Sequence, residues 1–169
     1  MLENVIKFDN IDLGICASLG LQRHMRKVQD GHNSGERMNT NLSWQECVAE
    51  EAESIAAEWS VARYFNIPFD TDTINDNYKN KADVGNGLEV KWTKYTDGHM
   101  IIHEWDRPSD IAVLVVGRSP VFTIKGWIPV SVARKPRYKH VSQPKWWVGQ
   151  MDLQPIETLK WSNYANAIN

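Results

Sequence analysis

Apolar residues between positions 44 and 65 recur every three or four residues, which is the period of an amphipathic helix. The stripe that they form consists of Val48, Ala52, Ile55, Trp59 and Ala62. Ser43 stands three residues before Glu46, and this spacing is typical of an N-terminal capping box. Because the residue before a proline avoids helical geometry, we expect the helix to end near Phe65, before Pro68.

Downstream of a polar connection over residues 70–79, the apolar pattern changes to that of β-strands. The strands are predicted at 81–84, 88–94, 111–116 and 121–130, with a further candidate at 146–148. The run 111–116 is continuously apolar, as expected for a strand that is buried on both faces. Upstream, residues 11–28 predict one or two short helices, and a polar loop follows over 29–41.

These elements predict an α/β or α+β domain in which helices flank a central mixed β-sheet of about four to five strands. In this interpretation residues 1–43 form a helical N-terminal extension, and residues 44–169 form the main domain. A chain of 169 residues has room for one such domain. Its 42% of hydrophobic residues excludes a largely disordered chain.

The formal net charge of −2 conceals two stretches of opposite charge. Residues 44–76 contain eight acids and one base, whereas residues 111–151 contain seven bases and no acid. The seven bases are Arg118, Lys125, Arg134, Lys135, Arg137, Lys139 and Lys145. Because such a region attracts a polyanion, the total charge does not exclude a nucleic-acid partner. A weaker basic patch on a predicted helix face consists of Arg23, His24, Arg26 and Lys27.

The two cysteines, Cys16 and Cys47, do not make a disulfide framework, and neither belongs to a cysteine and histidine cluster. We expect two buried thiols in a reducing cytosol. The N-terminal segment lacks the pattern of a signal peptide, and no apolar run approaches the ~18 residues needed to cross a membrane. The sequence therefore predicts a cytosolic protein without a membrane partner.

The candidate chemistry lies within residues 81–93. In a strand, Glu89 and Lys91 project from one face, and the apolar residues beside them project from the other face into the core. Such a pair is commonly no more than a solvated ion pair. Asp83 changes this interpretation, because it stands just across a turn and can complete a two-carboxylate metal site.

The register of the glycine-rich turn decides whether this site forms. A two-residue loop would turn Asp83 away from Glu89, because a slip of one residue moves a side chain to the other face. A three-residue loop pairs Val84 with Leu88 and places the two carboxylates on one face. We predict the three-residue loop, with Gly87 in the left-handed position.

An Asp followed by Glu-x-Lys on a neighbouring strand, after a helix that bears a glutamate, resembles the pattern of the PD-(D/E)xK nuclease superfamily. The resemblance extends to a set of small phage-encoded nucleases. Its further segments are 58–68 (EWSVARYFNIP), the apolar strand after Asp110, and 122–129 (FTIKGWIP). It covers roughly residues 44–160, and Ala82 stands where the superfamily name has a proline. It implies a restriction-endonuclease-like core and a metal-dependent deoxyribonuclease.

The metal ligands that the resemblance implies are Asp83, Glu89, the Val90 carbonyl and Glu58, the last directly or through water. The oxygen ligands suit Mg²⁺, and we expect Mn²⁺ to substitute. In the implied mechanism Lys91 orients or helps to deprotonate the attacking water, or neutralises charge on the phosphate. The resemblance selects Glu58 among the helix glutamates, while helical geometry also permits Glu51.

Next to such a site, we expect a basic segment to contact DNA phosphates. Its members are Arg134, Lys135, Arg137, Lys139 and Lys145. His99 and His103 have the spacing of a zinc pair on a helix. Their neighbours predict a strand instead, on which the two side chains would lie apart.

The sequence thus leads to a Mg²⁺-dependent DNA nuclease as the first hypothesis. One alternative is a catalytically silent nucleic-acid-binding or host-interaction protein on the same fold, and another is an RNA-directed enzyme. The sequence does not distinguish endonuclease from exonuclease action. The oligomeric state, including a homodimer, also stays open.

Overall fold

Helix α2 (Trp44–Phe65) begins and ends where the sequence predicts. In the computed structural model, which describes residues 4–31, 41–71 and 80–169, Ser43 and Glu46 form the expected capping box. The Ser43 hydroxyl accepts a hydrogen bond from the Glu46 amide, and the Glu46 carboxylate accepts one from the Ser43 amide. Asn66 ends the helix with a φ of 54°, in the left-handed region. The polar segments predicted over 29–41 and 70–79 lie largely outside the described residues.

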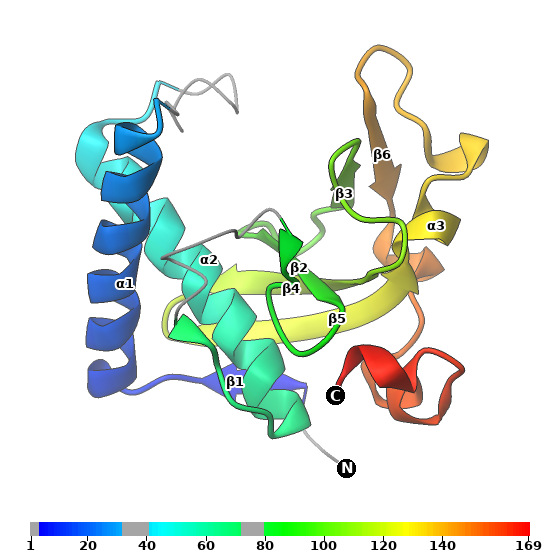
Figure 1. The fold of residues 1–169 in the computed structure, drawn as a ribbon, viewed down its shortest axis with the longest axis horizontal. Helices are drawn as coiled ribbons and strands as arrows, with labels where there is room; N and C mark the ends of the chain where they lie inside the picture. The colour runs from blue at the N-terminus through cyan, green and yellow to red at the C-terminus, as the bar shows by residue number, and fades with distance from the viewer. Residues whose placement is uncertain (1–3, 32–40, 72–79) are drawn as a thin grey trace.

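Helix α1 (Asn10–Gln29) is one continuous helix that packs along α2 (Figure 1). Strand β1 (Val5–Lys7) precedes it and pairs with β5 (Val121–Pro129). The predicted N-terminal extension therefore supplies an edge strand to the main sheet as well as a helix. The sequence predicted the helix and missed the strand, because three residues are too few to show a period.

The main sheet is mixed and has the strand order β1-β5-β4-β2. Strand β2 (Leu88–Thr93) runs parallel to β4 (Ile111–Arg118), and β5 runs antiparallel to β4 and to β1. A second sheet consists of β3 (Met100–His103) and β6 (Lys145–Val148), which are antiparallel. The predicted α+β class with a mixed sheet and a helical N-terminal region is confirmed.

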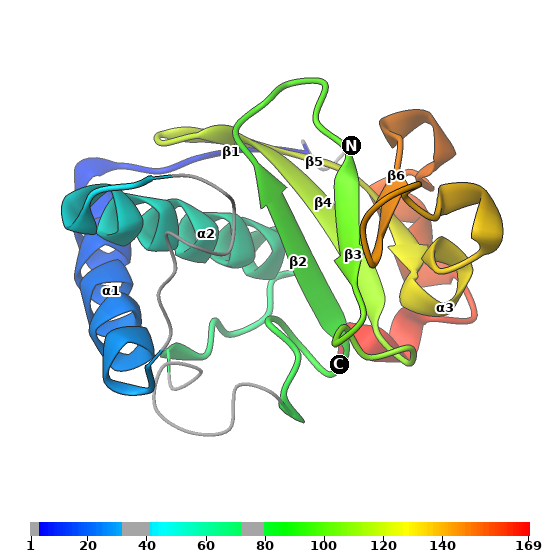
Figure 2. The ribbon, with the colours of Figure 1, turned by 90° about the horizontal axis from the view of Figure 1, so that it is seen from above.

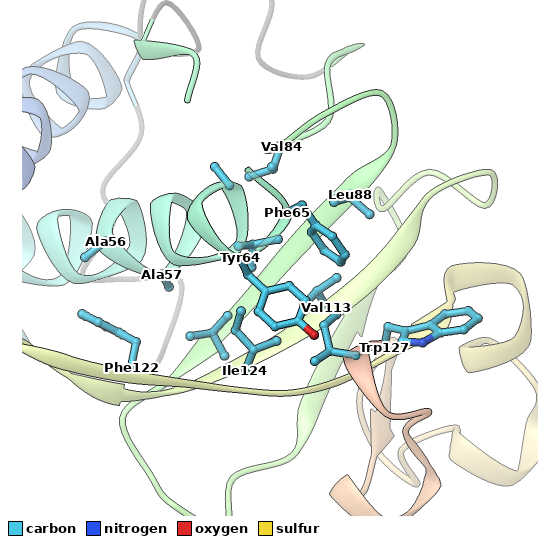
Figure 3. Close-up of a cluster of buried hydrophobic side chains, with 14 of the residues drawn as sticks. Ala56, Ala57, Tyr64, Phe65, Val84, Leu88, Val113, Phe122, Ile124 and Trp127 are labelled. Atoms are coloured by element: carbon cyan, nitrogen blue, oxygen red, sulfur yellow. The ribbon is translucent and has the colours of Figure 1, made fainter. Parts of the chain in front are cut away.

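Strand β4 separates two hydrophobic cores, as its continuously apolar sequence predicts. Val113 and Val115 pack in the core beneath α2, together with Phe65 and Leu88 (Figure 3). Leu114 and its alternate neighbours face the other core, beneath β3, β6 and the short helix α3 (Val130–Ala133). Figure 2 shows the main sheet between α1 and α2 on one side and the β3–β6 pair on the other.

Short 3₁₀ turns complete the C-terminal part of the chain. They are Pro136–Tyr138, Gln150–Asp152, Ile156–Trp161 and Ala165–Ala167. The last of them returns to the start of β2, where the Ala167 carbonyl accepts hydrogen bonds from the amides of Asn86 and Gly87, at 3.0 and 2.9 Å. Among the helices of the described residues, none is long and apolar enough to cross a membrane.

Candidate active site

The turn that leads into β2 has the three-residue register that the sequence predicts. Val84 and Leu88 exchange their two backbone hydrogen bonds, each of 3.1 Å, and so close a loop of three residues. The pairing is a single bridge, so the strand predicted over 81–84 does not form a ladder. The prediction of the left-handed residue was wrong: Gly85 has the positive φ of 59°, and Gly87 does not. The physical reason is the C-terminal segment, because a Cβ at Gly85 would collide with the Ile168 carbonyl.

Glu89 and Lys91 project from one face of β2, as the alternation of a strand predicts. The Lys91 ammonium donates hydrogen bonds to the Glu89 carboxylate at 2.9 Å and to the Asp106 carboxylate at 2.8 Å. Burial lowers the pKa of Lys91, but the negative charges of Glu89 and Asp106 outweigh it and the net pKa is raised. Lys91 is therefore a firmly protonated cation between two carboxylates.

Asp83 lies against the backbone of β2, where its carboxylate accepts a hydrogen bond of 2.8 Å from the Val90 amide. Burial raises the pKa of Asp83 well above its ordinary value, and the charges of Glu89 and Glu58 add to the effect. Burial also raises the pKa of Glu89, although Lys91 acts in the opposite direction. The charge of Glu89 thus opposes the ionisation of Asp83.

The helix glutamates named by the sequence are buried on α2 and are held by α1. Glu58 is 4% exposed, and both of its oxygens accept hydrogen bonds from Arg23, at 2.7 and 2.8 Å. Glu51, the second choice, is also buried and pairs with Lys27 at 2.5 Å. The structure therefore brings the charge of Glu58 near Asp83 but engages its oxygens with a guanidinium instead of leaving them open.

Two residues at the site were not assigned to it from the sequence, Asp106 and Arg23. Asp106 falls in a segment that reads as a turn before β4, yet it is buried and accepts hydrogen bonds from Lys91 and from the His103 amide at 2.7 Å. Arg23 belongs to the basic patch on α1, and its guanidinium lies within electrostatic range of Asp83. The sequence shows Asp106 as an acid before an apolar strand and Arg23 as part of a basic helix face. Neither pattern indicates which side chain the residue contacts.

The basic segment near the C-terminal half divides into one structural residue and several surface residues. Arg134 Nη2 donates hydrogen bonds to the carbonyls of His103, Glu104 and Asp106, so this guanidinium nitrogen is engaged within the fold. Two of the surface residues lie over aromatic rings, and another belongs to β6. The surface residues are Lys135, Arg137 over the Tyr138 ring, Lys139 over the Trp146 ring, and Lys145 in β6.

His99 and His103 do not lie on a helix: residues Met100–His103 form β3, as their neighbours predicted. In the described part of the chain, no group of three or more His, Cys, Asp or Glu side chains is arranged to hold a metal ion as it stands. Asp83 and Glu89 nevertheless provide hard oxygen donors, and a cation would offset the burial and the repulsion that raise the pKa of Asp83. These two residues fit a divalent cation, whereas Glu58 is engaged by Arg23.

Comparison of the chain with models of protein families, with curated proteins and with solved structures finds no match. The resemblance to the PD-(D/E)xK nucleases therefore stays a prediction from the sequence.

Proposed function

We propose that this chain is a metal-dependent DNA nuclease that hydrolyses phosphodiester bonds. The observation that carries the proposal is the cluster of Asp83, Glu89 and Lys91 at β2, an edge strand of the main sheet. Clustered, half-buried carboxylates cost stability unless a cation is bound, so their presence beside a protonated lysine supports a role in ion and phosphate binding.

In this proposal Asp83, Glu89 and the Val90 carbonyl hold Mg²⁺. The ion, when bound, supplies Lewis acidity and lowers the pKa of the attacking water. Lys91 neutralises charge on the phosphate, since an ammonium bonded to two carboxylates is poorly suited to accept a proton. Asp106 positions Lys91 by accepting a second hydrogen bond from its Nζ, beside the one to Glu89.

A second candidate function is favoured by a specific observation, namely that the chain's own cations already engage its acids. Arg23 occupies Glu58, and Lys91 bridges Glu89 and Asp106. A catalytically silent nucleic-acid-binding protein needs no divalent ion and would keep these pairs permanently. The two functions differ in whether a metal ion binds and whether DNA is cut.

The test uses linear, circular and branched DNA with Mg²⁺ or Mn²⁺, and with EDTA as the metal-free reaction. We expect the wild-type protein to cut at least one substrate only with metal, and Glu89→Gln and Lys91→Ala to lose most of the activity. The matched controls are Glu157→Gln and Lys7→Ala, which change exposed residues of the same types. A second measurement follows the melting temperature, which Mg²⁺ should raise for wild type and not for Glu89→Gln.

The outcomes separate the candidates. DNA binding without cleavage, together with a melting temperature that ignores Mg²⁺, supports the silent binder and rejects the nuclease. Equal cleavage by wild type and both site variants also rejects the proposed site.

A further inference from the structure

The connection between β3 and β4 begins with a turn that is held unusually firmly. The guanidinium of Arg134 donates to the carbonyls of His103 and Glu104, at 3.0 and 2.8 Å, and to that of Asp106. The Asp106 carboxylate accepts from the His103 amide at 2.7 Å. The backbone of residues 103–106 is therefore preorganised by the Asp106 side chain within the turn and by Arg134 from another part of the chain.

This turn presents a large aromatic ring to solvent. The Trp105 side chain is 70% exposed, and its ring lies parallel to the His103 ring, with the centroids 4.4 Å apart and an interplanar angle of 6°. The stack covers one face of the indole and leaves much of the ring accessible. Because the Trp105 ring is exposed, it does not contribute to packing in the core. The ring is therefore suited to contact a ligand.

The turn that carries the exposed ring also supplies a residue of the candidate active site. Asp106 follows Trp105 directly, and its carboxylate holds the Lys91 ammonium at 2.8 Å. A positive charge also accompanies the stack, because Lys145 of β6 lies directly opposite His103 of β3. A planar aromatic surface, a lysine beside it and the site's own cation together suit a nucleotide, which has a flat base and a negatively charged phosphate.

We propose that Trp105 and His103 form a stacking platform for an unpaired nucleobase next to the phosphodiester that the site attacks. This inference rests on the proposed nuclease function and names its substrate class as single-stranded or locally unpaired DNA. In a duplex each base is covered by its neighbours, so only an unstacked base can offer a free face to the indole. Arg134 positions the platform instead of contacting phosphate.

The experiment measures binding in the presence of Ca²⁺, by fluorescence anisotropy, so that the readout does not depend on cleavage. The probes are a labelled single-stranded oligonucleotide, the same strand with abasic sites, and a blunt duplex. We expect Trp105→Ala to weaken binding of the base-containing strand by about 5- to 100-fold, and Trp105→Phe to weaken it less. The control Trp161→Ala removes another exposed tryptophan, 89% exposed, and should bind like wild type.

The abasic strand should bind wild type and Trp105→Ala equally, because it carries no base to stack. The platform is overturned if Trp105→Ala binds the base-containing strand as wild type does, or if wild type binds the blunt duplex as tightly as the single strand. It is equally overturned if Trp105→Ala changes self-association and leaves DNA binding unchanged. Base-dependent binding without any cleavage in Mg²⁺ rejects the nuclease and keeps the platform, whereas cleavage with binding insensitive to Trp105 rejects the platform alone.

Discussion

Asp83 illustrates how a single residue can oppose the stability of the fold that contains it. Burial of its carboxylate, together with the charges of Glu89 and Glu58, raises its pKa well above the ordinary value. The hydrogen bond from the Val90 amide offsets only part of this cost. The metal-free fold therefore disfavours the ionised form of Asp83, which a bound cation would stabilise.

We predict that Asp83→Asn stabilises the metal-free protein at neutral pH. The pKa of Asp83 is higher in the folded chain than its ordinary value of 3.8, so its favourable contribution is complete below that value and is lost as the pH rises through the folded-state pKa. Asparagine does not titrate, and its side-chain oxygen can still accept from the Val90 amide.

The measurement is urea unfolding in EDTA, at about pH 7 and at about pH 3, where the acid is protonated in both states. We expect a gain of about 1 kcal/mol, or a rise of about 2–4 °C in melting temperature, at neutral pH and almost none in acid. Asp152→Asn, at an exposed position, is the control. A variant that is less stable at neutral pH would contradict the prediction.

At the scale of elements, α1 is an integral part of the fold and not an appended arm. It covers two acids of α2 with Arg23 and Lys27. It also approaches α2 closely at Gly20, where a Cβ would lie 2.7 Å from the Ala52 backbone nitrogen. Gly14, on the same helix, faces open space. Glycine is therefore required by close helix packing at position 20 and not at position 14.

We predict opposite effects for the same substitution at these two glycines. Gly14→Ala should stabilise the protein by about 0.5–1 kcal/mol, because alanine is the better helix former and meets no neighbour. Gly20→Ala should destabilise it by about 1–3 kcal/mol, because the added methyl group pushes the two helices apart. Urea unfolding of the two variants and wild type measures both effects, and a stabilising Gly20→Ala would show that the α1–α2 contact is looser than described.

At the scale of the whole molecule, the charges are separated as the sequence suggested, with one change. The acids of the site collect at β2 and α2, and the surface bases lie around β6. Arg134 differs from the other candidate phosphate contacts, since its guanidinium Nη2 donates to three carbonyls within the fold. The remaining bases are at the surface and carry the electrostatic part of the proposed DNA binding.

We predict that replacing Lys135, Arg137 and Lys139 together by alanine flattens the salt dependence of DNA binding. Each lost phosphate contact should lower the slope of log K against log salt by about one. The control replaces Lys7, Arg118 and Lys160 by alanine, which removes the same charge from exposed positions elsewhere. The measurement is the binding constant over a series of salt concentrations. Equal slopes for the two triple variants would show that Lys135, Arg137 and Lys139 do not contact DNA phosphates.

The sequence by itself determined the features that depend on neighbours along the chain. The capping box at Ser43, the end of α2 before Pro68, the doubly buried β4 and the shared face of Glu89 and Lys91 follow from local sterics and periodicity. The three-residue register of the turn before β2 belongs to the same group, because loop length sets which residues pair.

The tertiary structure alone decided which distant side chains meet. Arg23 reaches Glu58 across 35 positions of sequence, and Arg134 reaches the turn at His103 across 31. Such pairings depend on how helices and strands pack, and a local pattern of polar residues does not encode their partners. For the same reason the sequence did not indicate that Asp106 meets Lys91, or that the Trp105 ring stacks on the His103 ring.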